Sequence, residues 1–245
     1  QSIGSKVGKK YSGTLADIGG YSLNYHKHIN TGEGGIIVTN NKKLYERSCL
    51  IRNHAEAAIK KNNIKNLSNM IGYNFRLGEI ECAIGIEQLK KLNRLIKKRI
   101  KLVEILNREL IKLKYLKTPK TLKKNSHVYY LYPLTLETDK LNIKRSTIIS
   151  NLKKLGVPGL IEGYVNIHEL PNYKKKIAYG TRHFPWKLNK DDKKNNSDNK
   201  NLDIAEKLHR EKFFAIELCL FDFNNSDIYF IINCFKKVWD TLNIK

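Results

Sequence analysis

The chain has 245 residues, of which 41% are hydrophobic and 28% are charged, so it can bury the core of one large or two moderate globular domains. No apolar run approaches the roughly 20 residues of a membrane-spanning helix, and we expect no membrane partner. The formal net charge of +23 comes from 46 lysines and arginines that are spread along the whole chain. This spread favours a compositional bias over a specific nucleic-acid-binding face, which would gather its charge in one patch.

The first predicted elements are two short strands around a polar loop. The runs GGYSLNY (19–25) and GGIIVTN (34–40) are rich in β-branched and aromatic residues and are bounded by glycines. They predict a hairpin-like unit whose loop contains Lys27 and ends in the glycine-rich turn TGEGG at 31–35. In so basic a chain, a lysine does not by itself indicate a functional site. Only the residues around it can do so.

Two helices are predicted next. The segment at 41–55 (NKKLYERSCLIRNHA) indicates a short helix that leads into a polar loop at 54–69. After it, apolar residues recur at steps of three and four and predict a long amphipathic helix from about 78 to 113. These residues are Ile80, Ala83, Ile84, Leu89, Leu92, Ile96, Ile100, Val103, Leu106 and Leu110.

The C-terminal part mixes strands and helices. We expect a strand at 127–136 (HVYYLYPLTL), a helix at 142–156 that ends at a glycine, and another strand at 157–164. A final helix at 226–243 would have Ser226 as its N-cap. The polar stretch at 187–201 has almost nothing to bury and indicates a mobile surface loop. This order of elements predicts an α/β fold with a smaller α+β second domain.

The four cysteines indicate neither a metal site nor a disulfide framework. They are widely scattered, form no CxxC pair and lie near no histidine cluster at zinc spacing. We therefore expect reduced thiols in the core of a cytoplasmic protein. The four are Cys49, Cys82, Cys219 and Cys234.

Two motifs together resemble one enzyme family. Ser22, four further residues and Lys27, followed by the TGEGG turn, are similar to the cofactor-lysine segment of the nucleotide-sugar aminotransferases, the perosamine-synthase-like branch of the fold-type I pyridoxal-phosphate enzymes. The segment at 71–92 (IGYNFRLGEIECAIGIEQLKKL) resembles the family's Gly-Tyr-Asn-x-Arg turn and the start of its long helix. The segment YVNIHELPNY at 164–173 is similar to the family's C-terminal domain. Two motifs in the right order and separation are more specific than either alone.

The resemblance implies an α/β fold of the fold-type I aminotransferase type. Residues 1–95 would form the C-terminal part of the cofactor-binding large domain and residues 96–245 a smaller α+β domain, linked by the long helix at about 78–113. In the family, a preceding portion supplies the residue that stacks on the cofactor ring and the acidic partner of its pyridine nitrogen. We therefore expect this chain to be a C-terminal fragment that is inactive by itself.

The resemblance also implies roles for four residues. Lys27 would be catalytic and would bind pyridoxal 5'-phosphate, forming a Schiff base with its aldehyde and later moving a substrate proton. Ser22 would bind the cofactor phosphate, and Asn74 would reach the phosphate in the neighbouring subunit, which implies a homodimer with shared active sites. His168 would lie near the substrate. The structural alternatives are a strand hydroxyl for Ser22, a helix cap for Asn74 and a surface-loop histidine for His168.

The implied reaction is the transamination of a nucleotide-linked keto-sugar to an amino-sugar, with glutamate as the donor, in polysaccharide or lipopolysaccharide biosynthesis. One alternative is a sugar dehydrase, because some relatives have a histidine in place of the lysine and His28 follows Lys27 here. The register from Ser22 and Gly32 favours Lys27. A non-catalytic homologue is another alternative, and a basic nucleic-acid-binding protein is the alternative from a different class.

Overall fold

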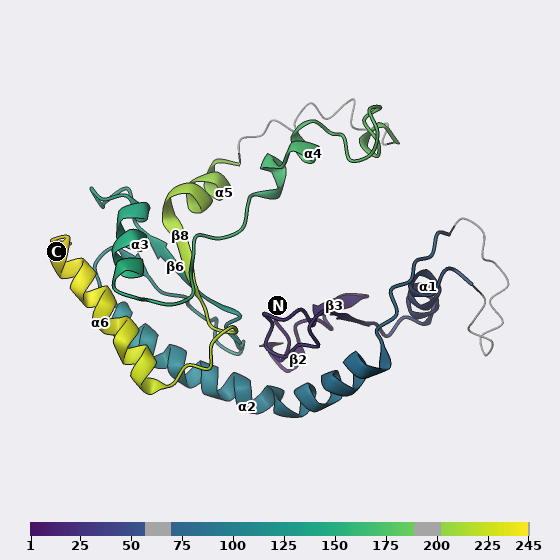
Figure 1. Cartoon of the computed structure of the whole chain (residues 1–245), viewed down its shortest axis with the longest axis horizontal. Coiled ribbons are helices and arrows are strands. Elements are labelled where there is room, and N and C mark those ends of the chain that lie inside the picture. Colours follow the sequence, from purple (N-terminus) through teal and green to yellow (C-terminus); the bar gives the residue numbers. More distant parts are fainter. Residues whose placement is uncertain (57–69, 189–201, 245) are drawn as a thin grey trace. The chain divides into compact units, whose positions relative to one another are not determined.

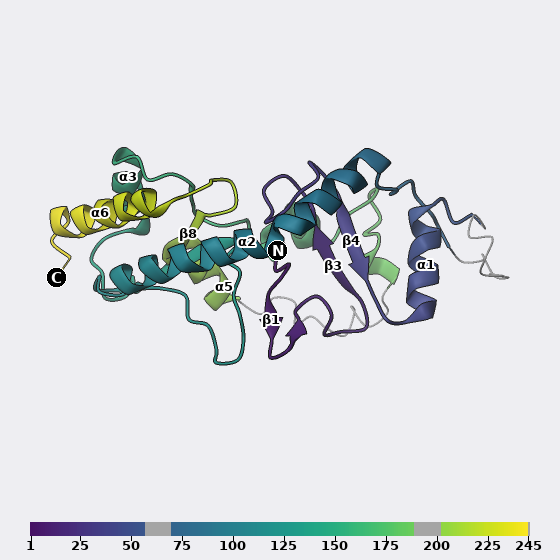
Figure 2. The ribbon, with the colours of Figure 1, turned by 90° about the horizontal axis from the view of Figure 1, so that it is seen from below.

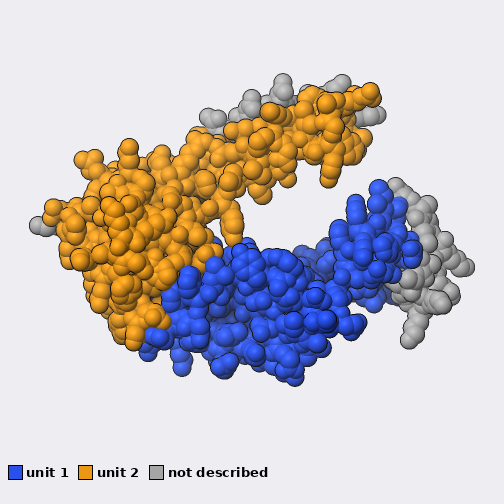
Figure 3. All heavy atoms as spheres, in the orientation of Figure 1, with its two compact units in different colours: residues 1–106, 120–131, 218–225 blue, residues 107–119, 132–217, 226–245 orange. Residues whose placement is uncertain are grey.

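The computed structural model describes residues 1–56, 70–188 and 202–244. They form two compact units, coloured separately in Figure 3, and each unit is assembled from several stretches of the chain. Unit 1 comprises Gln1–Leu106, Lys120–Leu131 and Leu218–Asn225, and unit 2 comprises Asn107–Pro119, Tyr132–Glu217 and Ser226–Lys245. The predicted loops at 54–69 and 187–201 lie almost entirely outside the described residues. The division into domains near residue 95 stays a prediction.

Unit 1 contains two antiparallel strand pairs (Figure 1). Its strands are β1 (Lys6–Val7), β2 (Lys10–Tyr11), β3 (Gly19–Ser22) and β4 (Gly35–Val38). β1 pairs with β2, and β3 pairs with β4 in a register that sets Ser22 opposite Gly35. Residues 23–34 therefore connect β3 to β4, and the predicted hairpin around Lys27 is confirmed. Figure 2 shows its two strands side by side.

The short helix α1 (Lys42–Arg52) is also confirmed. It begins after Asn41, whose side-chain oxygen accepts hydrogen bonds from the backbone N–H groups of Lys43 and Leu44, at 3.0 and 3.3 Å. An asparagine at this position satisfies N–H groups that have no partner within the helix. The helix buries Leu50.

The long helix α2 (Glu79–Leu110) confirms the predicted amphipathic helix within a few residues at each end. Two glutamates in its first turn and Arg108 in its last turn complement the helix dipole. In unit 1 its residues Leu92 and Ile96 pack against Leu23 and Ile29 of the β3–β4 loop to form a small hydrophobic core. This core fixes the loop against the helix.

The first part of the apolar stripe of α2 is exposed in the described chain, although the periodicity suggested a buried face. Ile80 is 75% exposed and Leu89 is 56% exposed. Buried residues of the stripe begin at Leu92, and Val103, Leu106 and Leu110 are fully buried. Helical periodicity predicts which residues share a face but not whether another element covers it.

Unit 2 is built on a four-stranded sheet in the order β5-β6-β8-β7. β5 pairs with β6 and β7 pairs with β8, both antiparallel. The strands are β5 (Leu116–Lys117), β6 (Leu131–Leu136), β7 (Leu160–Ile161) and β8 (Phe213–Glu217). The helices are α3 (Arg145–Lys154), η1 (Ile167–Glu169), α4 (Pro171–Lys174), η2 (Trp186–Leu188), α5 (Asp203–Lys207), the π-helical η5 (Leu208–Lys212) and α6 (Asn225–Thr241).

The core of unit 2 combines the sheet with α3 and α6. Alternate residues of β6 are buried, beginning with Tyr132, because successive side chains of a strand point to opposite faces. In α6 the predicted apolar stripe is buried along the whole helix, and the ring of Phe235 stacks between Phe214 and Trp239. The Trp239 indole donates a hydrogen bond to the backbone oxygen of Lys114 at 2.9 Å, so its polar atom is also satisfied.

Several sequence-based boundaries were wrong. The strand predicted at 127–136 begins only at Leu131, because Tyr129 has a φ of 54°, which no strand residue adopts. α6 begins at Asn225, so Ser226 lies in its first turn and is not the N-cap. Strand β8 was not predicted, since its residues are buried on both faces and show no alternation.

The four cysteines were expected in the core, which is wrong for three of them. All four thiols are free in the structure. Only Cys234 is buried, and Cys49, Cys82 and Cys219 are half-buried. Burial raises the pKa of the Cys234 thiol, which lowers its reactivity.

Candidate active site

The loop that carries Lys27 is closed by backbone hydrogen bonds. The N–H of Leu23 donates to the oxygen of Gly34 at 2.8 Å, and the N–H of Thr31 donates to the oxygen of Leu23 at 3.0 Å. At its end, the Thr31 hydroxyl donates to the backbone oxygen of Glu33 at 2.7 Å. Gly34 has a φ of 155°, and a Cβ there would lie 2.8 Å from the Thr31 hydroxyl oxygen. The glycine-rich turn thus permits a tight return of the chain to β4.

The Lys27 side chain is buried although it carries an amine. It is only 7% exposed, its Nζ lies 2.9 Å from Nε2 of His26, and Nζ is 4.2 Å from the centre of the Tyr130 ring. Burial lowers the pKa of Lys27 from its usual value, and the nearby Cys219 opposes this effect. A lysine with a lowered pKa is neutral more often, and the neutral amine is the nucleophile.

His28 fastens the loop to α2. Its Nδ1 lies 2.6 Å from the Arg99 guanidinium and 3.6 Å from the Cys219 thiol. Because a guanidinium can only donate, Nδ1 is the acceptor and the ring is neutral. Burial, followed by the charge of Arg99, lowers the pKa of His28 to about 3. From the sequence, His28 was considered only as the basis of the dehydrase alternative. The contact with Arg99, which is 71 residues away in the chain, could not be foreseen.

Ser22 lies at the end of β3, directly before the loop. Its hydroxyl oxygen accepts a hydrogen bond from the backbone N–H of Asn24 at 3.3 Å, within the same turn. Ser22 therefore directly precedes the closed loop that carries Lys27.

Asn74 is exposed and forms an isolated backbone bridge with Asn53. Arg76 joins the two side chains, because Nε donates to Oδ1 of Asn74 at 3.0 Å and a terminal nitrogen donates to Oδ1 of Asn53 at 2.7 Å. Asn74 does not cap α2, which begins five residues later at Glu79. The helix-cap alternative is therefore wrong.

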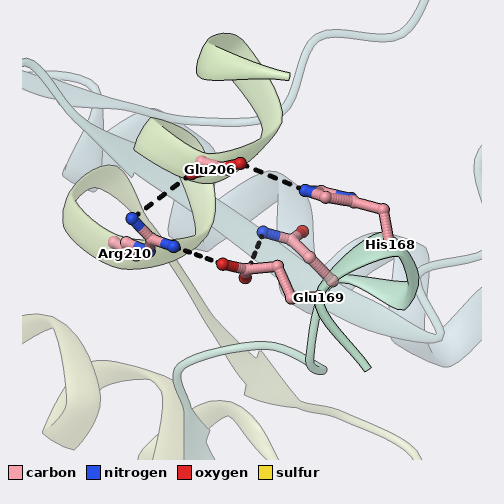
Figure 4. A network of polar contacts seen from close by, with 5 residues as sticks. His168, Glu169, Glu206 and Arg210 are labelled. Atoms are coloured by element: carbon pink, nitrogen blue, oxygen red, sulfur yellow. Dashed lines mark hydrogen bonds and ion pairs between the residues drawn. The ribbon is translucent and has the colours of Figure 1, made fainter. Parts of the chain in front are cut away.

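His168 belongs to unit 2, where it takes part in a network of polar contacts (Figure 4). Its Nε2 lies 3.3 Å from Glu206, which is also 3.3 Å from Arg210. Arg210 in turn pairs with Glu169, the residue after His168. The i,i+4 spacing of Glu206 and Arg210 was a signal for part of this network that sequence analysis did not use. The network joins η1 to α5 and η5.

Within residues 1–56, 70–188 and 202–244, no three histidine, cysteine, aspartate or glutamate side chains lie close enough together to hold a metal ion. Every helix in these stretches is too short or too polar to span a lipid bilayer.

The chain is similar to known proteins in its sequence. The sequence matches the DegT/DnrJ/EryC1/StrS aminotransferase family over residues 1–191. The UDP-4-amino-4,6-dideoxy-N-acetyl-beta-L-altrosamine transaminase of Campylobacter jejuni (strain 81-176) is 32% identical over 176 residues, which are 72% of this chain and 46% of that protein. GDP-perosamine synthase of Escherichia coli O157:H7 is 31% identical over 179 residues, 72% of this chain and 46% of that enzyme.

Solved structures have the same fold. Helicobacter pylori PseC, an aminotransferase involved in the biosynthesis of pseudaminic acid, matches 98% of this chain with a TM-score of 0.73 and 24% identity, over 57% of its own length. The E. coli GDP-4-keto-6-deoxy-D-mannose-3-dehydratase with bound hydrated PLP matches 95% of this chain with a TM-score of 0.73 and 24% identity, over 57% of its own length. These likenesses confirm the expected fold-type I aminotransferase architecture.

The chain spans about half the length of the curated relatives it matches. The family match covers the β3–β4 loop with Lys27, helix α2 and much of unit 2. On this evidence, the chain belongs to the DegT/DnrJ/EryC1/StrS aminotransferase family.

Proposed function

We propose that the full-length protein carrying this chain is a cytoplasmic, pyridoxal-phosphate-dependent aminotransferase. It converts a nucleotide-linked keto-sugar into an amino-sugar, with glutamate as the amino donor, for polysaccharide or lipopolysaccharide biosynthesis. The observation that carries the proposal is the buried Lys27 amine on a closed loop, in a chain of an aminotransferase family. The names of the two curated relatives support a nucleotide-linked sugar as the substrate.

The residues of this loop fit the cofactor. A buried primary amine with a lowered pKa is suited to bond covalently to an aldehyde. When bound, pyridoxal phosphate supplies that aldehyde and a ring that accepts electrons from the substrate carbon. Ser22 would hold the phosphate from the start of the same loop, and Asn74 would do so from the neighbouring subunit. Nζ of Lys27 would take a proton from the substrate and return it.

The dehydratase alternative requires a histidine to replace the lysine. His28 is the candidate, but its Nδ1 accepts a hydrogen bond from Arg99 and its ring is buried. Its imidazole thus serves as a loop anchor. This engagement of His28 favours Lys27 as the reactive residue and the aminotransferase over the dehydratase.

Chemical labelling tests the cofactor assignment. Full-length protein is incubated with pyridoxal phosphate, reduced with borohydride and digested for peptide mapping. We expect a pyridoxyl group on Lys27, because its buried amine is the one suited to the aldehyde. Lys42, whose side chain is 83% exposed, is the internal control and should stay unlabelled at equimolar cofactor. Label found only on other lysines would contradict the proposal.

Subunit mixing tests the shared-site homodimer. Without the Asn74 amide, a hydrogen bond to a charged phosphate is lost, so Asn74→Ala should weaken cofactor affinity by roughly 10- to 150-fold. At limiting cofactor, Asn74→Ala and Lys27→Ala should each be inactive alone. A heterodimer of the two carries both changes in one site and leaves the other intact, so activity should partly return on mixing. If mixing restores nothing while subunits do exchange, Asn74 acts within its own chain or not at all.

A further inference from the structure

His26 shares a turn with Lys27, and the two side chains meet. Successive side chains of an extended strand point to opposite faces, so a contact between neighbours requires a turn. Asn24 supplies it, since its backbone oxygen accepts from the N–H of Lys27 at 3.0 Å and its side-chain oxygen accepts from the N–H of His26 at 3.4 Å. The result is the distance of 2.9 Å between Nε2 of His26 and Nζ of Lys27.

This contact and the Tyr130 ring together favour the charged form of the amine. An ammonium can only donate hydrogen bonds, so beside a charged Lys27 the Nε2 of His26 would be the acceptor and the ring proton would lie on Nδ1. The face of the Tyr130 ring, 4.2 Å from Nζ, carries the negative part of the ring quadrupole. The His26 ring also lies 5.8 Å from the Tyr130 ring, so the two groups adjoin each other around the amine.

No carboxylate of the described residues lies within ion-pair distance of Lys27. The rings of His26 and Tyr130 are therefore the main groups that stabilise its ammonium in place of water. Among the described residues, the Cys219 thiol also influences the charge of this amine. Tyr25 lies against the His26 ring, with the ring centres 4.9 Å apart. A buried ammonium without an opposite charge is costly unless hydrogen bonds and a ring face replace its water.

We propose that His26 and Tyr130 form a holding site for the Lys27 ammonium whenever this amine is free. The inference rests on the proposed function, in which Lys27 takes up a substrate proton and later returns it. In the holding site the proton stays on Nζ, Nε2 of His26 accepts one of its N–H groups, and the Tyr130 ring faces the charge. His26 is thus a positioning residue that acts through Lys27.

The test measures how readily Lys27 loses its proton. Trinitrobenzenesulfonate reacts with neutral amines only, so the pH dependence of its reaction at Lys27, followed by peptide mapping, gives a midpoint for that amine. The full-length protein is used without added cofactor. We compare His26→Phe, which removes the acceptor, with His26→Gln, whose side-chain oxygen can replace Nε2 as acceptor.

We expect the midpoint to fall by about one pH unit or more in His26→Phe. The loss of a hydrogen bond to a charged group destabilises the ammonium by a free energy that corresponds to a pKa shift of this size. In His26→Gln the midpoint should stay close to that of the unchanged protein. Loosening of the loop would act in the opposite direction, since exposure to water raises the pKa of a buried lysine. His26 is a half-buried loop residue, so both variants should fold.

Tyr130 is tested with Tyr130→Leu, which removes the ring face, and Tyr130→Phe, which keeps it. A lower midpoint in Tyr130→Leu alone supports the ring's part in the site. An unchanged or higher midpoint in His26→Phe, or an equal fall in His26→Gln, overturns the proposal. The assay involves no cofactor, so failure of pyridoxal phosphate to label Lys27 would remove the proposed function and leave this result standing.

Discussion

Replacing Lys27 by arginine should reduce transamination by the full-length protein by at least about 10²- to 10⁴-fold, the contribution typical of a positioned acid or base. Arginine keeps a positive charge and a similar length, but it stays protonated at every accessible pH and cannot act as a nucleophile or base. The loss should appear in kcat, because the chemical steps themselves need a neutral amine. Steady-state assays with a keto-sugar nucleotide and glutamate measure it.

The matched control is Lys42→Arg. Lys42 lies at the start of α1 with its side chain 83% exposed, and its ion pair with Glu46 survives the change. Its activity should stay within a factor of two of the unchanged protein, because exposed ion pairs contribute little. If Lys27→Arg, with an unchanged melting temperature, retained a tenth or more of the activity, Lys27 would not be the catalytic lysine.

Replacing Phe235 by alanine should lower the free energy of unfolding of unit 2 by about 3 to 5 kcal/mol. Phe235 is completely buried, and its ring lies 6.0 Å from that of Trp239 and 6.3 Å from that of Phe214. Removing it leaves a cavity between two large rings that cannot easily close. Urea unfolding followed by tryptophan fluorescence is suitable, because both tryptophans of the chain, Trp186 and Trp239, belong to unit 2.

Phe230 provides the control on the same helix. It is 48% exposed, so Phe230→Ala removes the same atoms from a position that is already half in water. Its cost should be under about 1 kcal/mol, since surface substitutions rarely exceed that. Similar losses in the two variants would mean that α6 does not face the core of unit 2 as described.

The elements predicted correctly from the sequence are those with a strong local pattern. The two strands around Lys27 are bounded by glycines, and α6 has an uninterrupted apolar stripe, so both could be read without tertiary information. Strand β8 could not be predicted, because a strand buried on both faces shows no alternation. The backbone conformation of Tyr129 could not be predicted either, since nothing in the sequence indicates that an aromatic residue will adopt a positive φ.

In the candidate site, too, only the features with a local sequence pattern could be predicted. Lys27 stands out through a motif of nearby residues, which a single sequence displays. The environment of Lys27 is made by residues far away in the chain: Tyr130 beside Nζ, Arg99 on His28, and Cys219, which is 191 residues from His28. Such contacts depend on how α2 and two later segments pack, and no local pattern records them.

The closed connection between β3 and β4 also restricts how this part of the chain can diverge among related proteins. Both ends of residues 23–34 are fixed, by the pairing of Ser22 with Gly35 and by the hydrogen bonds of Leu23 to Gly34 and Thr31. A deletion of one residue would shift the pairing register and turn every side chain of one strand to the opposite face. The length of this connection is therefore fixed, and insertions or deletions among homologues should fall outside it.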